Sequence, residues 1–147
     1  MAERSVEGET YDTIVVGQDA QHHYTISGSV YEHFMNAYDV RGRLQVDEAY
    51  AHGKGFEARV MPGSVLDGFI SHFLGRVFPG EGTLLHSMQI QYKSPSHPGD
   101  EILVKGTVMQ KSDAVRVLML DLRLTNLTRN RMAAKAKVQV GLLGAGA

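Results

Sequence analysis

The stretch SVLDGFISHFLGRV, residues 64–77, has the strongest helical pattern in the chain and decides the fold. Its apolar residues recur at the spacing of one wide helical face, made of Val65, Leu66, Phe69, Ile70, Phe73, Leu74 and Val77. The tripeptide MPG, residues 61–63, precedes this helix, and Pro79-Gly80 ends it. Because so wide an apolar face is unfavourable in water, the sequence predicts a sheet that wraps around the helix.

The residues that follow the helix have the pattern of a sheet. Apolar and polar residues alternate over four stretches, at residues 84–92, 102–108, 118–125 and 132–140. Each stretch has one polar face, so we expect four consecutive strands in an antiparallel meander whose apolar face packs on the helix. The turn-rich segment SPSHPGDE, residues 94–101, separates the first two strands. The sequence therefore predicts an α+β domain with an antiparallel sheet wrapped around a central helix.

The N-terminal half is expected to be mainly helical. Residues 22–26 alternate and predict one short strand. Residues 29–38 predict a helix that begins with a Ser29–Glu32 capping box. Residues 39–46 have the composition of a loop, and residues 47–51 predict a further helical turn.

Composition limits the classes of function. The chain has 147 residues, 43% of them hydrophobic, which is enough for one domain with one core. We expect a flexible lead-in at residues 1–12, the domain at 13–142 and a tail at 143–147. A net charge of −1 gives no reason to expect nucleic acid, and no apolar run is long enough to span a membrane. There is no cysteine for disulfides or thiolate metal sites, and the polar N-terminus is unlike a signal peptide, so we expect a cytoplasmic protein.

Two long stretches resemble one protein family. VDEAYAHGKGFEARVMPG, residues 46–63, is similar to the H-x-D-x-x-Y-A … G-F … R-I-A-H-G pattern of the MaoC-like, (R)-specific enoyl-CoA hydratases. FLGRVFPGEGTLLHSMQIQYKSPSHPGDEI, residues 73–102, is similar to their L-G … P-G-x-G-T … F … P-V-x-P-G-D pattern. Together with the start of the central helix, the resemblance covers roughly residues 12–142 and implies the hot-dog fold.

The resemblance also implies a ligand and an assembly. The ligands of this family are acyl thioesters of coenzyme A or of an acyl-carrier protein, and no cofactor is implied. The family pairs two sheets edge to edge with the central helices back to back, and the ligand tunnel lies at the subunit interface. We therefore expect an acyl-thioester ligand and a homodimer or a dimer of dimers.

The family's catalytic loop departs from its pattern in this sequence. The pattern is F-x-x-x-S-G-D-x-N-P-x-H-x-D, and counted from Phe34 without a gap its catalytic Asp falls on Val40 and its His on Gln45. Gln45 cannot act as a general base, because an amide does not titrate near neutral pH. A shift of one residue would bring Asp39 into the place of the Asp, and Asp47 keeps the later acid. We therefore expect a non-standard active-site loop, and hydration of a simple enoyl thioester near background.

The binding half of the family's site is retained. Gly63 matches the glycine whose backbone N–H holds the thioester oxygen, at a helix N-terminus that offers free donors. Pro62 replaces the family's His before that glycine, and Ser71 matches a helix serine that faces the site in some members. The structural alternatives are that Gly63 is an ordinary helix-start glycine and that Ser71 is a buried serine bonded to its own helix.

Other candidates have weaker patterns. Asp67 and His52 resemble, at imperfect spacing, the acid and the His of another hot-dog branch, the 3-hydroxyacyl-carrier-protein dehydratases. Asp67 also fits an acid that stabilises a helix N-terminus. His86 falls on the apolar face of its strand, where it would line the tunnel or the core. The remaining histidines have no metal-ligand spacing or partner pattern, so no metal site is predicted.

The expected loop at residues 39–46 also contains two arginines. Arg41 and Arg43 are either a solvated basic loop or a pair of guanidinium forks that bind a ligand carboxylate or phosphate.

Three functions remain open from the sequence. The first is a MaoC-like hydratase or dehydratase with rearranged catalytic groups. The second is a hot-dog thioesterase in which Asp39, Asp47 or Asp67 activates water. The third is a non-catalytic acyl-binding subunit that pairs with a homologue carrying the Asp/His dyad.

Overall fold

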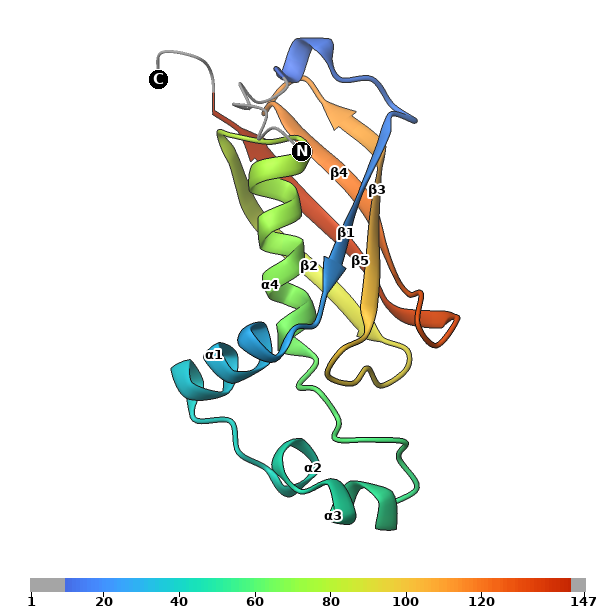
Figure 1. The fold of residues 1–147 in the computed structure, drawn as a ribbon. Coiled ribbons are helices and arrows are strands. Elements are labelled where there is room, and N and C mark those ends of the chain that lie inside the picture. Colours follow the sequence, from blue (N-terminus) through green and yellow to red (C-terminus); the bar gives the residue numbers. More distant parts are fainter. Residues whose placement is uncertain (1–9, 144–147) are drawn as a thin grey trace.

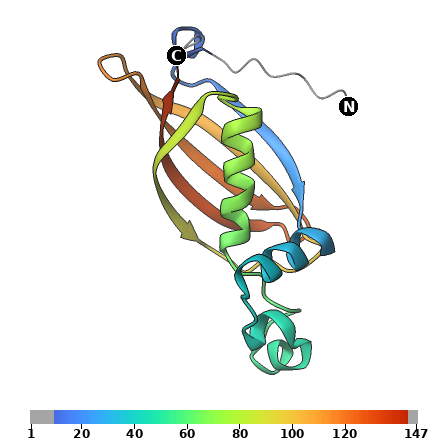
Figure 2. The ribbon, with the colours of Figure 1, turned by 90° about the vertical axis from the view of Figure 1, so that its left-hand side faces the viewer.

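The central helix forms as the sequence predicts. The computed structural model describes residues 10–143, and in it α4 (Ser64–His72) continues into a π-helical turn, η2 (Phe73–Val77). The sheet curls around this helix (Figures 1 and 2). The apolar face that meets the sheet is buried at Val65, Leu66, Phe69, Ile70, Phe73 and Leu74. The predicted α+β architecture, an antiparallel sheet wrapped around a central helix, is confirmed.

The sheet has a different strand order from the expected meander. Its strands are β1 (Asp19–Thr25), β2 (Thr83–Tyr92), β3 (Glu101–Ser112), β4 (Val117–Asn126) and β5 (Arg131–Leu142). They are antiparallel in the order β1-β3-β4-β5-β2. The meander is right for β3, β4 and β5 but wrong for β2, which pairs with β5. The reason lies in residues 93–100, which are too long for a tight hairpin and carry the chain past the ends of β5 and β4.

Alternation over most of their length buries one face of the three central strands. The inward residues of β4 are Leu118, Leu120, Leu122 and Leu124, each at most 1% exposed. Full burial of a leucine contributes about 1.5–3 kcal/mol, so this row is a large part of the core. On β3 the helix approaches so closely that a Cβ on Gly106 would lie 2.8 Å from Phe73 Cε1. Glycine at this position therefore lets the phenyl ring lie directly on the sheet.

Strand β2 departs from the predicted alternation near its start. A register shift between Leu85 and Ser87 marks a bulge, after which Met88 and Ile90 pack against the core. The bulge turns His86 onto the outer face, where its ring lies over Gly141 of β5 and is exposed. The alternative that His86 lies in the core is therefore wrong, because the extra residue of a bulge shifts side-chain direction.

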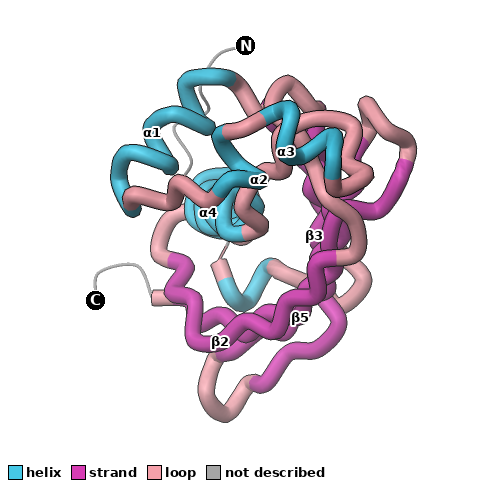
Figure 3. Tube along the Cα trace, turned by 90° about the horizontal axis from the view of Figure 1, so that it is seen from below, coloured by secondary structure: helices cyan, strands magenta, loops and turns pink. Residues whose placement is uncertain are grey.

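Three helices lie at the end of the sheet where α4 begins (Figures 1 and 3). Helix α1 (Gly28–Tyr38) has the predicted position, but Ser27 is its cap and accepts a bond from Val30 N at 3.0 Å. Ser29 instead contacts His33 Nδ1 at 3.1 Å, so the expected capping box is wrong.

The expected loop at residues 39–46 is partly helical. It contains the single-turn α2 (Arg43–Val46), which is followed by α3 (Glu48–Gly53) in the place of the predicted turn. Asp47 caps α3 by accepting a bond from Tyr50 N at 3.0 Å.

The packed body begins earlier than residue 13. A 3₁₀ turn, η1 (Tyr11–Thr13), buries Tyr11, whose hydroxyl donates to Asp113 Oδ1 at 2.7 Å. The predicted lead-in is therefore wrong for residues 10–12, while residues 1–9 and 144–147 lie outside the described part. Within residues 10–143, no helix is both long and apolar enough to cross a membrane.

Candidate active site

A pocket of about 380 Å³ lies where α4 begins. It forms because the chain entering α4 meets the segment that leaves β2. Its walls are Val60, Met61, Gly63, Ser64 and Leu66 from the first segment and Tyr92, Lys93, Ser94, Pro95 and Ser96 from the second. The two segments lie far apart in the sequence, so only the fold brings this set together.

Gly63 presents a backbone donor beside the pocket. It immediately precedes α4, and within residues 10–143 its N–H has no hydrogen-bond acceptor, while its carbonyl accepts from Leu66 N at 2.9 Å. Free N–H groups and the helix dipole give a helix N-terminus a positive potential. Such a donor is suited to an oxygen that gains negative charge during a reaction. The neighbouring Pro62 lacks an N–H and contributes its carbonyl to Val65 N at 3.1 Å.

Tyr92 packs directly on this glycine. Its ring leaves so little space that a Cβ on Gly63 would lie 2.8 Å from Tyr92 Cε1. The Tyr92 hydroxyl donates to Asp67 Oδ1 at 2.8 Å. Desolvation, followed by the hydrogen bond and the charge of Asp67, raises the pKa of Tyr92 to about 12. The hydroxyl therefore stays protonated at neutral pH and remains a donor.

This contact gives Asp67 a partner that sequence reasoning missed. Asp67 lies in the first turn of α4, as an acid that favours a helix N-terminus does, but within residues 10–143 its side chain accepts from Tyr92 and from no backbone N–H. Tyr92 was visible in the sequence only as the last residue of an alternating strand. Its position at the end of the strand was the one available signal. Where a strand ends beside the start of a helix, a long polar side chain can reach that helix.

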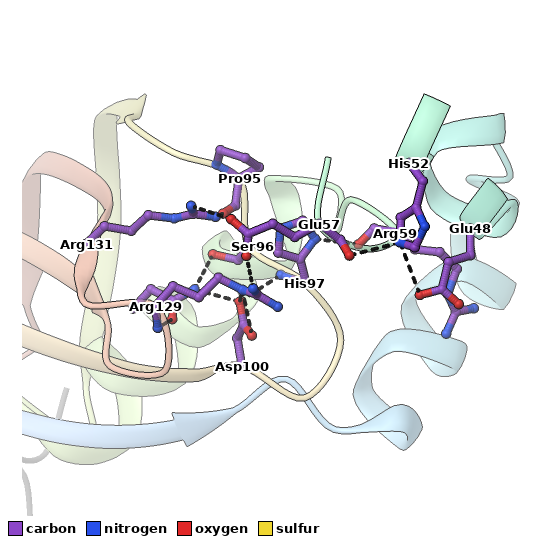
Figure 4. Close-up of polar contacts among 11 residues, drawn as sticks. Glu48, His52, Glu57, Arg59, Pro95, Ser96, His97, Asp100, Arg129 and Arg131 are labelled. Carbon is purple, nitrogen blue, oxygen red and sulfur yellow. Dashed lines mark hydrogen bonds and ion pairs between the residues drawn. The ribbon is translucent and has the colours of Figure 1, made fainter. Parts of the chain in front are cut away.

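Behind the pocket wall is a buried polar network (Figure 4). His97 and Asp100 are 1% and 2% exposed, and Asn126 is fully buried. Asp100 Oδ2 accepts from the backbone N–H of His97 at 3.0 Å and from Asn126 Nδ2 at 2.7 Å. Asn126 also reaches the pocket residue Ser96 at 3.3 Å. His97, which has no partner pattern in the sequence, also meets a distant backbone group, because its Nδ1 lies 2.8 Å from the carbonyl oxygen of Arg59.

Arg129, in the β4–β5 turn, and Arg131, the first residue of β5, tie this network to the segment before α4 (Figure 4). Arg129 Nε donates to Asp100 Oδ2 at 3.0 Å, and its guanidinium also pairs with Glu57. Arg131 contacts Glu57 Oε1 at 3.3 Å and the carbonyl of Pro95 at 2.6 Å. We call Glu57, Arg129 and Arg131 the clasp. It holds the segment after α3 against the pocket wall.

The loop residues Asp39 and Gln45 lie outside the pocket walls. Asp39 has a left-handed backbone at the end of α1, and its side chain is 90% exposed. Its carboxylate pairs with Arg41 Nε at 3.3 Å, and Arg41 also bonds to Asn36. Gln45 lies in α2 with its side-chain amide against Gly42, and its backbone carbonyl accepts from the Tyr31 hydroxyl. The structure therefore does not bring Asp39 and Gln45 together with Gly63.

The second loop arginine is bound by its own neighbours. Arg43 lies 3.4 Å from Asp47 Oδ2, and its guanidinium lies 4.1 Å from the centre of the Tyr50 ring. The backbone N–H of Tyr50, followed by Arg43, lowers the pKa of Asp47. Asp47 thus acts as a helix cap and ion-pair partner in this loop.

The two remaining candidates, Ser71 and His52, do not line the pocket. Ser71 is exposed on α4, so its interpretation as a buried serine is wrong. His52 is exposed on α3, where its Nε2 lies 3.0 Å from the carbonyl oxygen of Glu57 and 4.0 Å from Glu48 (Figure 4). Over residues 10–143 the structure contains no cluster of three or more His, Cys, Asp or Glu side chains suited to a metal ion.

Comparison with known structures supports the fold. The R-hydratase PhaJ1 from Pseudomonas aeruginosa superposes with a TM-score of 0.86 at 22% identity, covering 94% of this chain and 88% of that chain. The (R)-hydratase from A. caviae involved in PHA biosynthesis gives a TM-score of 0.82 at 23% identity, covering 89% and 98%. The ChsH1-ChsH2 complex from Mycobacterium tuberculosis gives 0.77 at 14% identity, covering 89% and 100%. These likenesses confirm the hot-dog fold.

Sequence comparison identifies the family. No family model matches the chain. An (R)-specific enoyl-CoA hydratase from Rhodospirillum rubrum is 32% identical over 98 residues, which span 67% of this chain and 68% of the relative. This degree of identity over two thirds of both chains confirms the resemblance of the sequence motifs. The chain belongs to the MaoC-like, (R)-specific enoyl-CoA hydratase family.

Proposed function

We propose that this chain binds an acyl thioester of coenzyme A or of an acyl-carrier protein in the pocket beside Gly63. There it adds water to a 2-enoyl chain or removes water from a 3-hydroxyacyl chain. The observation that carries the proposal is the free N–H of Gly63 at the start of α4, directly on the pocket. When water adds to the enoyl double bond, charge moves to the thioester oxygen, and this donor would stabilise it.

The test is turnover of defined thioesters by the purified chain. Trans-2-enoyl-CoA substrates of increasing length, and the same acyl groups on a carrier protein, are followed by loss of the conjugated enoyl absorbance. The expected product is a 3-hydroxyacyl thioester, identified by chiral chromatography. If the protein neither binds nor converts any of these thioesters, the proposal is wrong.

One contact favours a thioesterase as the second candidate. Of the three acids that the sequence offers for water activation, only Asp67 bonds to a pocket residue, Tyr92, at 2.8 Å. A carboxylate near an oxyanion donor can activate water for attack on the thioester carbonyl itself. Release of free thiol, without a 3-hydroxyacyl product, would identify this activity in the same assay.

We propose a homodimer formed along the free edge of β2. That strand is at one end of the strand order, and its Leu84 and Leu85 are 53% and 38% exposed. An uncovered strand edge with apolar side chains is a natural pairing surface. Sedimentation at micromolar concentration is expected to give a dimer or a dimer of dimers. A stable monomer would contradict the proposed assembly, and dimerisation only with a dyad-bearing homologue would support the partner-subunit alternative.

A further inference from the structure

We propose that Tyr92 is the catalytic group that moves protons in this pocket and that Asp67 is its positioning residue and proton acceptor. The inference rests on the proposed hydratase function and names the residues that perform it. It answers a specific difficulty, because Val40 and Gln45 stand where the family places its Asp and His. Turnover therefore requires another group that can exchange a proton with water and with the acyl chain.

The walls of the pocket leave few alternatives to Tyr92. Among the described residues that line it, the titratable side chains are Tyr92 and Lys93. Both side chains are exposed, but the Tyr92 ring is held against Gly63 and by its bond to Asp67. Asp39 and His52 are engaged elsewhere, with Arg41 and with Glu57 and Glu48 respectively.

The backbones of β2 and α4 hold Tyr92 and Asp67 near Gly63, the proposed oxyanion donor. Tyr92 is the last residue of β2 and is paired with Ala134 of β5. Asp67 is on the first turn of α4, four positions after Gly63. The ring of Tyr92 lies against Gly63, and both residues line the pocket beside the Gly63 N–H, while the Tyr92 hydroxyl donates to Asp67. A thioester oxygen at that N–H places the acyl carbons C2 and C3 within the same small space.

The proton balance of hydration closes through these two residues. Water bonds to C3 while one of its protons passes to the Tyr92 oxygen, and the Tyr92 proton passes to Asp67. The electron pair of the C2=C3 bond moves toward C1 and onto the thioester oxygen, which the Gly63 N–H holds. Tyr92 then gives its proton to C2, the electron pair returns to form the C2–H bond, and Asp67 returns a proton to Tyr92. The net change is addition of one water, and both enzyme groups end as they began.

This arrangement makes two chemical demands that the structure meets. The phenol must be protonated at neutral pH, and a pKa raised to about 12 keeps it so. The phenolate must not accumulate, and the hydrogen bond to Asp67 lets one proton leave as another arrives. Because one phenol serves both carbons from one face, hydration is expected to be syn.

The test compares two matched tyrosine variants. Tyr92→Phe removes only the hydroxyl and keeps the ring on Gly63. Tyr24→Phe is its control, since the Tyr24 hydroxyl lies 2.8 Å from His72 Nδ1 and its ring stacks on Phe69 of the same helix, outside the pocket walls. Tyr92→Phe should lower kcat by about 10²–10⁴-fold with little change in the Kd of a saturated acyl-CoA. Tyr24→Phe should leave kcat within about threefold.

Two further readouts separate proton transfer from a structural role. Asp67→Asn keeps an acceptor for the Tyr92 hydroxyl but cannot take its proton, so kcat should fall to a similar extent. The double variant, Tyr92→Phe with Asp67→Asn, should be no slower than the slower of the two single variants, because the two residues act as one unit. In deuterium oxide the parent should place deuterium at C2 on the face that receives the C3 hydroxyl.

The outcomes distinguish this inference from the proposed function. If Tyr92→Phe retains kcat within about threefold of the parent, Tyr92 does not move the proton and the inference is wrong. If Tyr92→Phe lowers kcat and also binds the saturated acyl-CoA much more weakly than the parent, the inference is wrong as well, because the residue would then serve binding. If the parent binds no acyl-CoA and converts no enoyl thioester, the proposed function itself is wrong.

Discussion

The ring of Tyr92 occupies the space that a side chain on Gly63 would need, with Cε1 2.8 Å from the position of a Cβ. The backbone of Gly63 is in the ordinary right-handed helical region, so its conformation does not require glycine. It is the close approach of the Tyr92 ring that requires a glycine at this position. The glycine thus lets an aromatic wall of the pocket lie directly over the start of α4.

Gly63→Ala is expected to displace the Tyr92 ring and to weaken the hydrogen bond between Tyr92 and Asp67. Overpacking of this kind typically costs about 1–3 kcal/mol, which urea denaturation would measure. Gly28→Ala is the control, because Gly28 begins α1 and a Cβ there would meet no other part of residues 10–143 within 4 Å, its own helix aside. If Gly63→Ala is as stable as Gly28→Ala and keeps the native Tyr92 environment by NMR, the packing argument fails.

Glu57→Gln is expected to open the clasp. Its carboxylate contacts Arg129 and Arg131, but its side chain is 56% exposed, so the loss of global stability should be no more than about 1 kcal/mol. The local effect should be larger, because Glu57 joins the segment after α3 to the sheet. Limited proteolysis within residues 43–59 should become faster. Glu48→Gln, at a residue whose carboxylate lies 4.0 Å from His52 Nε2, should be cleaved at the parental rate.

Asp100→Asn should be much more destabilising than a surface change. The Asp100 side chain is 2% exposed and faces Arg129, whose side chain is 23% exposed. Breaking a buried pair typically costs about 3–5 kcal/mol, and partial access of Arg129 to water favours the low end. Asp12→Asn, which alters a 3.5 Å pair with Arg116 at a side chain 78% exposed, should change stability by less than about 1 kcal/mol. Equal urea midpoints for the two variants would contradict this account of the network.

Restoring the family's residues in the loop should not create a standard hydratase. Val40 packs against the hydrophobic core, so a carboxylate in Val40→Asp would be drawn toward water or would destabilise the loop. The double variant, Val40→Asp with Gln45→His, is expected to hydrate enoyl-CoA no faster than the parent. Gln45→His alone controls for stability. A tenfold or larger gain by the double variant would show that the original scaffold is intact.

Stability should fall as pH drops through the range of histidine titration. Burial, followed by His22 and Arg76, lowers the pKa of His72, and Tyr24 bonds to its ring at 2.8 Å. As the pH falls through about 6.5, His72 of the unfolded chain takes up a proton before His72 of the folded chain does, so acid favours unfolding. At higher pH the ring is neutral in both states, and this destabilisation is absent. The Tm should decrease from about pH 7.5 to 5.5. His72→Gln should reduce that decrease, and an unchanged Tm profile in this variant would exclude His72 as a cause.

The sequence by itself determined the central helix and the apolar faces of the central strands. The spacing of Val65, Leu66 and Phe69 requires a helix with one wide apolar side, and the leucines of β4 require a strand buried on one face. These features are local, because a period of 3.6 or 2 is read from consecutive residues. The quoted motifs also identified the family and placed Gly63 at the helix start.

Only the tertiary structure decided which distant groups meet. Alternation does not specify a strand's partner, so β2 was expected beside β3 but pairs with β5. The same holds for the site: Tyr92 bonds to Asp67 across 25 residues, and Asn126 bonds to Asp100 across 26. His97 looked unpartnered because its acceptor is the backbone of Arg59, which no side-chain pattern reveals. Such contacts depend on how the helix, the sheet and the long connection pack together, and no local periodicity encodes that arrangement.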